Sequence, residues 1–232
     1  MKCVLHARVF CGAILVLYLF CGNILPTFAI NNNMIKNSFS SSSSPYSEKQ
    51  IALVMDLYKN ISNYEGICVA IDLMKGTKGD YSRQVILGNN ETNKPIKIMF
   101  KDLSKINPSY GKADALGMKK GSQIYIYINE KNRNAPVIAI ASLLSHEALH
   151  QDKFNSLSEE TCAWTTEAIV WGELAEKYPQ YQDNLSLLAC REKTLKLLYE
   201  KGGETSKYIK TIVYSSPSYQ NLPETSPGFS IL

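Results

Sequence analysis

An apolar run that ends in two histidines limits the fold of this chain more than any other feature of its sequence. Residues 137–150 read VIAIASLLSHEALH, and the ionisable side chains among them are His146, Glu147 and His150. A helix that is apolar on nearly all sides has to be buried, so we expect a central helix that the rest of the domain surrounds. The Asn-Ala-Pro sequence at 134–136 suits its start, with the Asn as N-cap and the Pro in the first turn.

The two histidines are spaced to bind one ion. Residues four apart lie on one face of a helix, so His146 and His150 can both direct an imidazole nitrogen at one zinc ion, about 2.0–2.1 Å away. Glu147 is placed to act as the general base that takes a proton from a water molecule. The alternative is that the two histidines only hydrogen-bond in the core or face solvent. Burying two imidazoles and a carboxylate is costly, which argues against this alternative. We therefore expect one zinc ion per chain, although iron and other divalent metals suit similar ligands.

A third protein ligand has to come from elsewhere, and the next predicted helix carries three candidates: Glu159, Glu160 and Glu167. Ser156 and Glu159 have the spacing of a capping box, which engages Glu159 with the backbone at the helix start. Glu160 points about 100° away from Glu159 around the helix, and we predict Glu160 as the ligand. If Ser158 is the N-cap instead, Glu159 stays a candidate.

These residues resemble the gluzincin group of zinc metallopeptidases, and most closely its compact minigluzincin type. The shared pattern is His146-Glu-Ala-Leu-His150, a short turn, and then Glu159-Glu160-Thr-Cys-Ala163. The resemblance implies a zinc metalloendopeptidase-like hydrolase with an HExxH motif, in which a glutamate of the next helix is the third ligand. It also implies a zincin-like α+β fold: a small mixed sheet with an edge strand beside a central HExxH helix, followed by a C-terminal helical part.

The resemblance leads to further expectations. In such enzymes an edge strand binds the peptide or protein substrate as an added strand, and Gln123–Asn129, where isoleucines alternate with tyrosines, is the clearest strand of the chain. Trp164 stands where many gluzincins have an aspartate, so Glu167, one turn further on, is the candidate to support a histidine. Four tyrosines are equal candidates for stabilising an oxyanion: Tyr178, Tyr199, Tyr208 and Tyr214.

Two other functions fit the same residues. A non-catalytic, zinc-stabilised binding domain would keep the histidines and cleave nothing, although such a site has no need of Glu147. A zinc amidohydrolase acting on a non-peptide amide, for example in cell-wall material, is the other. Nucleic acid is not an expected partner, because the net charge of +4 is small and dispersed and no cluster of basic and aromatic residues is present.

The N-terminus predicts export. Lys2 and Arg8 precede an uncharged, mostly apolar run over residues 9–35. This layout is typical of a signal peptide, here cleaved after Ala29, and the run is also nearly long enough to stay as a membrane anchor. Both interpretations place the following domain outside the cytoplasm, secreted or tethered to the membrane through this segment.

The chain divides into a signal peptide or membrane anchor at 1–29, a Ser/Asn-rich linker at 30–46, a metallopeptidase-like domain at 47–214 and an irregular tail at 215–232. Apolar patterns and turn residues predict four strands, at 67–73, 84–87, 96–101 and 123–129. Besides the apolar run, helices are predicted after Ser47, which forms a capping box with Gln50, and over roughly Leu157–Lys177. Pro179 separates the latter from a third helix, which has Leu185 to Tyr199 on its apolar face and stops at Gly202.

Three cysteines follow the N-terminal run: Cys68, Cys162 and Cys190. Their odd number and wide spacing allow one disulfide and one free thiol, or three buried thiols. No CxxC spacing occurs, so the sequence does not support a cysteine-bound metal.

Overall fold

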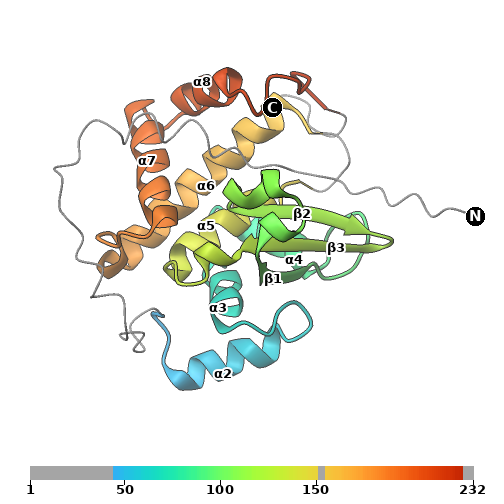
Figure 1. Ribbon diagram of the computed structural model, residues 1–232. Helices are drawn as coiled ribbons and strands as arrows, with labels where there is room; N and C mark the ends of the chain where they lie inside the picture. Colours follow the sequence, from blue (N-terminus) through green and yellow to red (C-terminus); the bar gives the residue numbers. More distant parts are fainter. Residues whose placement is uncertain (1–43, 151–154, 227–232) are drawn as a thin grey trace, which may run out of the picture.

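The computed structural model describes residues 44–150 and 155–226. Within these ranges the chain forms seven α-helices and a three-stranded mixed sheet (Figure 1), which confirms the expected α+β class. Short 3-10 helices also occur, at Leu103–Lys105, Pro108–Lys112, Glu130–Asn132 and Pro179–Tyr181. No helix in the described ranges is both long and apolar enough to cross a membrane. The predicted signal or anchor segment and nearly all of the linker lie outside the described residues.

The sheet has the strand order β1-β3-β2. β1 (Lys97–Lys101) pairs in parallel with β3 (Gln123–Asn129), and β2 (Ala115–Lys120) pairs antiparallel with β3. Buried and less buried residues alternate along β1, as a strand with one covered face requires. Gly121 lies in the turn from β2 to β3, and its φ of +59° is a left-handed conformation that glycine adopts without strain. Both strands predicted from alternation are therefore confirmed.

β3 is the central strand of the sheet and not the edge strand expected from the sequence. β1 pairs with it on one side and β2 on the other, so its backbone is already hydrogen-bonded on both sides. The expectation is wrong because β2, with the sequence ALGMKK, lies in a glycine-containing stretch that reads as a loop ending in a polar turn. Among the described residues β2 pairs with β3 alone, so β2 is the edge strand on that side.

α5 (Val137–Glu147) is the buried helix that the apolar run predicts. Every residue of it is buried. It packs against α3, α6 and α7 and contacts β2, and Figure 1 shows it in the interior of the molecule. Because α5 has no solvent-facing side, the polar side chains near its end are forced into the core as well.

Both ends of α5 differ from the prediction. The N-cap is Pro136 and not Asn134, because proline lacks an N–H and is best tolerated at a helix start. The helix ends at Glu147, before His150 is reached. A tight turn follows, in which the Leu149 N–H donates to the His146 carbonyl at 3.0 Å. This turn still brings the second histidine beside the first, with ring centroids 5.1 Å apart.

Two of the predicted strands are helices. Residues 67–73 belong to α3 (Glu65–Leu73) and residues 84–87 to α4 (Asp80–Leu87). α3 is buried along most of its length and packs against α5, and a short apolar run looks the same in a buried helix and in a buried strand. α4 ends at Gly88, whose φ of +123° is closed to most other residues.

The remaining helices follow the predictions more closely. α2 (Glu48–Leu57) has the predicted capping box between Ser47 and Gln50. α6 (Leu157–Lys177) has the predicted bounds, and α7 (Leu187–Lys201) ends at Gly202. α8 (Lys207–Ser215) is not among the predicted helices.

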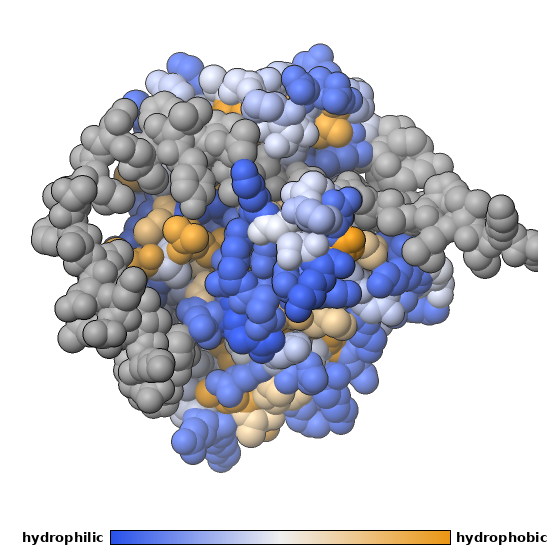
Figure 2. Space-filling view, viewed as in Figure 1, coloured by the Kyte–Doolittle hydropathy of each residue, from blue (hydrophilic) through white to orange (hydrophobic). Residues whose placement is uncertain are grey.

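A small second core joins the C-terminal helices. It contains Trp164 of α6, Leu195 of α7, Ile209 and Val213 of α8, and Tyr219. Residues 216–226 form turns and no helix, but Tyr219 ties them to this core. On the face shown in Figure 2, hydrophilic residues cover the centre and hydrophobic residues appear in smaller groups around it.

The three cysteines of the described chain are free thiols. Cys68 is buried, Cys190 is partly buried and Cys162 is exposed, so neither predicted arrangement of the three is found. Burial raises the pKa of the Cys68 thiol to about 11, which makes it an unreactive core residue.

Candidate metal centre

The candidate site forms where the end of α5 meets the start of α6, two helices that pack against each other. Ser156 is the N-cap of α6, and its hydroxyl accepts a hydrogen bond of 3.1 Å from the Glu159 N–H. The alternative cap, Ser158, is excluded because it lies within the helix. This cap fixes the register of α6, and with it the directions in which the first-turn glutamates point.

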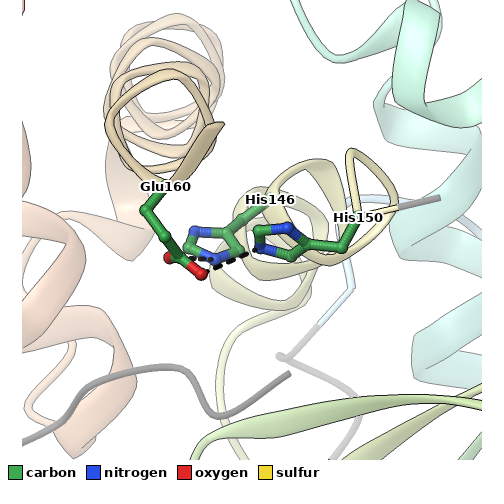
Figure 3. Close-up of side chains that lie close together, drawn as sticks. All are labelled: His146, His150 and Glu160. Carbon is green, nitrogen blue, oxygen red and sulfur yellow. Dashed lines mark ion pairs between the residues drawn. The ribbon is translucent and has the colours of Figure 1, made fainter. Parts of the chain in front are cut away.

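His146, His150 and Glu160 face one another across this junction (Figure 3). His146 Nε2 lies 3.8 Å from Glu160 Oε2, and His150 Nε2 lies 3.7 Å from Glu160 Oε1. All three side chains are buried, and one ligand atom from each lies within 4.8 Å of the other two. The structure thus brings together the three residues that the sequence predicts as metal ligands.

Glu159 orients His150 from the other side of its ring. Glu159 Oε1 and His150 Nδ1 are 2.8 Å apart, a hydrogen-bond distance. Only half of the predicted capping box forms, because the Glu159 carboxylate contacts His150 where the box would have it contact the backbone. Burial opposes the charged form of His150, but facing Glu160 and hydrogen-bonded Glu159 outweigh it and raise the pKa to about 9.

Glu167 lies in the corresponding place beside His146. Its Oε2 is 3.0 Å from His146 Nδ1, one turn after Trp164, in the position that the sequence suggests for a supporting carboxylate. Carboxylates beside Nδ1 are common partners of metal-binding histidines, because they fix the tautomer and orient the ring. Glu167 and Glu159 therefore both act on histidines, and of the three candidate glutamates Glu160 alone faces both Nε2 atoms.

Arg191 of α7 holds Glu167 in the core. Its guanidinium contacts Glu167 Oε1, Asp114 Oδ2 and Glu192 Oε1. Burial opposes the charge of Glu167, but Arg191 and then His146 outweigh it and lower its pKa. Burial and neighbouring Glu167 raise the pKa of Glu192 well above its ordinary range. No sequence pattern predicts these contacts, because Arg191 lies 24 positions from Glu167 and 77 positions from Asp114.

Glu147 is buried next to the three candidate ligands. It is 4% exposed, and its Oε2 has no hydrogen-bond partner among the described residues. Burial raises its pKa, and the nearby histidines oppose this shift. A carboxyl group of this kind, close to the ligands and with one oxygen that no described residue engages, can take up and return a proton.

The charge of the site suits a cation. Five glutamates near the junction are less than 5% exposed: Glu147, Glu159, Glu160, Glu167 and Glu192. Arg191 contacts two of them, and His150, whose pKa is raised to about 9, faces Glu159 and Glu160. A metal ion held by neutral imidazoles would supply the positive charge that these buried carboxylates need. Glu160 Oε2 has no hydrogen-bond partner among the described residues, although it lies 3.8 Å from His146 Nε2.

The spacing of the donors suits a small metal ion. Two atoms that each lie about 2.0–2.2 Å from one zinc ion are at most about 4.4 Å apart. The 3.7 and 3.8 Å between Glu160 and the two histidines fall inside this limit. Two imidazole nitrogens and a carboxylate therefore form a donor set that could hold a metal ion with little movement.

Of the four tyrosines proposed for the oxyanion, Tyr178 is the one that helix geometry places far from the ligands. Tyr178 follows the far end of α6, about 27 Å along the helix from Glu160 at about 1.5 Å per residue. Tyr199 and Tyr214 pack beside the second core, and Tyr208 lies over the ammonium groups of Lys201 and Lys207.

No family model, no curated protein and no solved structure matches this chain. The functional argument below starts from the chemistry of the site.

Replacing Arg191 with methionine tests the buried charge network. Arg191→Met leaves Glu167 without its cation in the core, and we expect the free energy of unfolding to fall by about 3–5 kcal/mol. The control is Lys196→Met on the same helix, since Lys196 pairs with Glu200 near the surface and such pairs contribute about 0–1 kcal/mol. Denaturant unfolding measures both, and equal losses in the two variants would contradict the network.

Proposed function

We propose that this protein is a zinc-dependent metallopeptidase with a zincin-like arrangement, of the gluzincin type. The observation that carries the proposal is the convergence of three side chains in a buried site: His146 and His150 through Nε2, and Glu160 through both oxygens. Glu147, with an unengaged carboxyl oxygen, stands next to them. Three such ligands and one free carboxylate are what a hydrolytic zinc site needs from the protein.

Zinc is proposed over magnesium and calcium because of the donor set. Two imidazoles and one carboxylate are the protein ligands of many catalytic zinc sites, whereas magnesium and calcium prefer oxygen donors alone. When bound, a zinc ion would supply a coordinated water whose pKa is lowered to about 7, and it would polarise a carbonyl group. His146, His150 and Glu160 would hold it.

The side chains around these ligands have separate tasks. Glu147 takes a proton from the water that attacks the peptide carbonyl and gives it to the nitrogen of the leaving amine. Glu159 and Glu167 keep the two imidazoles in the tautomer and orientation that leave Nε2 facing Glu160. Arg191 keeps Glu167 charged, because its guanidinium contacts that carboxylate in the core.

The proposed substrate is a peptide or protein that adds as a strand to the edge of the sheet. β3 cannot accept it because both of its sides are paired, but β2 has a side without a strand partner among the described residues. β2 also contacts α5, the helix that leads to His146. An extended segment on β2 would be held by backbone hydrogen bonds close to the site. The export inferred from Lys2, Arg8 and the apolar run places this activity outside the cytoplasm.

Burial favours a second candidate function, a non-catalytic binding domain that zinc stabilises. His146, Glu147, His150 and Glu160 are all less than 8% exposed. A structural zinc site is closed, whereas a catalytic site keeps one position open for water or substrate. The two candidates differ in what they require of Glu147.

Metal analysis of the purified protein tests the ligands. We expect one zinc ion per chain, and loss of that ion in the His146→Ala/His150→Ala double variant. Among single glutamate variants on α6, Glu160→Gln should bind zinc most weakly, because it alone removes a charged ligand. Glu159→Gln and Glu167→Gln should lose about 10- to 100-fold in affinity, as is typical for residues that orient a ligand.

The control for this series is Glu176→Gln, since Glu176 is an exposed residue of the same helix. It should bind zinc as the parent protein does. A parent protein without stoichiometric metal, or a Glu160→Gln variant that binds as tightly as the parent, would show that the ligands are assigned wrongly.

Glu147→Gln separates the catalytic from the structural function. This variant should keep its zinc and lose activity by about 10²–10⁴-fold, because it removes the general base and no ligand. The assay is cleavage of a broad peptide library, with and without a chelator, by the parent, Glu147→Gln and Glu176→Gln proteins. Full activity of Glu147→Gln would refute the mechanism. A parent protein that binds zinc but cleaves no peptide would refute the peptidase and leave the binding domain and the amidohydrolase of a non-peptide amide.

A further inference from the structure

Residues 216–226 fold back onto the start of α6. The Leu157 N–H donates to the Pro223 carbonyl at 2.9 Å, and the Ser158 N–H donates to the Glu224 carbonyl at 3.0 Å. The first N–H groups of a helix have no partner within it. The C-terminal segment therefore supplies acceptors at the end of α6 that carries the glutamates of the site.

Ser226 extends this contact to Glu159. Ser226 is 8% exposed, and its Oγ lies 3.3 Å from Glu159 Oε2 and 3.2 Å from Ser156 Oγ. Carboxylate oxygens accept hydrogen bonds, so the Ser226 hydroxyl donates to Glu159 and the Ser156 hydroxyl can donate to Ser226. The Glu159 N–H in turn donates to Ser156 Oγ. The hydrogen bonds thus close a ring, which runs from the Glu159 carboxylate through the Ser226 and Ser156 hydroxyls to the Glu159 N–H.

This ring acts on the carboxylate that orients a candidate metal ligand. One oxygen of Glu159 contacts Ser226, and the other lies 2.8 Å from His150 Nδ1. The Glu159 side chain is 4% exposed, so solvent has little access to its oxygens. If Ser226 is removed, the carboxylate can turn away from the imidazole.

The other end of the segment is fixed close to His146. Tyr219 is 2% exposed, and its hydroxyl accepts a hydrogen bond of 3.0 Å from Trp164 Nε1. The Trp164 ring packs edge-on against the His146 ring, with centroids 5.0 Å apart. Tyr219 thus anchors the segment that places Ser226.

We propose that Ser226 is a positioning residue for the metal site, acting on His150 through Glu159. The C-terminal segment is then a part of the metal centre, although it supplies no ligand. This inference rests on the proposed metal binding and adds to it a residue 66 positions after Glu160 in the sequence.

Zinc affinity of the full chain, measured by competition with a chelator, tests the proposal. Ser226→Ala should bind zinc about 10-fold more weakly than the parent, within the range typical of residues that orient a ligand through another group. Ser226→Thr keeps the hydroxyl and should bind within about twofold of the parent. Ser218→Ala, in an exposed part of the same segment, is the matched control and should bind as the parent does.

Two further measurements separate positioning from a general loss of structure. The thermal unfolding midpoint of the metal-free protein should be the same for Ser226→Ala and Ser218→Ala. In a Glu159→Ala background, Ser226→Ala should cost no further affinity, because the residue through which it acts is gone.

Each result has a defined meaning. Ser226→Ala that binds zinc as tightly as the parent overturns the proposal, and so does an equal loss of affinity with and without Glu159. A lower unfolding midpoint of metal-free Ser226→Ala assigns Ser226 to folding and also overturns it. A parent protein that binds no zinc contradicts the proposed function itself. The His146→Ala/His150→Ala double variant tests that function independently of Ser226.

Discussion

Each histidine of the site has a buried carboxylate beside its Nδ1 atom, and the rest of the arrangement depends on these two contacts. Glu159 lies 2.8 Å from His150 Nδ1, and Glu167 lies 3.0 Å from His146 Nδ1. With Nδ1 engaged in this way, Nε2 of each ring is left to face Glu160. Without such partners the two imidazoles could rotate about their side-chain bonds. His146, His150 and Glu160 would then no longer point at one common position.

Carboxylates in a core need partners of their own, and distant parts of the chain supply them. Arg191 contacts Glu167 from α7, and Ser226 contacts Glu159 from the C-terminal segment. Burying an isolated charge costs several kcal/mol, and a well-placed partner offsets at least part of that free energy. The helices after α6 therefore serve the site as well as the fold, because they bring these partners to it.

The sequence predicts features that are set by residues close together in the chain, and it does not predict contacts between residues that are far apart in it. The pairing of His146 with His150 follows from a spacing of four residues, and Glu160 follows from helical geometry near a cap. Glu159 does not form the full capping box that the sequence predicts, because its carboxylate contacts His150 and not the backbone. Arg191 and Ser226 could not be predicted, because contacts across tens of residues leave no periodic pattern.

The same limit explains the errors in the fold. The apolar run at 67–73 holds a single polar residue, Asp72, which is too few to distinguish a buried helix from a strand. β2 is not predicted because Gly117 and two lysines interrupt its pattern. The edge position expected for β3 comes from the gluzincin resemblance, and the pairing of β3 on both sides corrects it. Alternation in β1 and β3 was sufficient to predict both, since each shows period two over five or more residues.

X-ray absorption at the zinc edge of the metal-loaded protein tests the central claim most directly, because it reports the ligand atoms themselves. The account predicts nitrogen and oxygen neighbours at about 2.0–2.2 Å, with the outer-ring scattering of two imidazoles and no sulfur at about 2.3 Å. In the His146→Ala/His150→Ala variant the imidazole signal should disappear. A sulfur neighbour, or a spectrum of the loaded parent without imidazole scattering, would contradict a metal centre built from His146, His150 and Glu160.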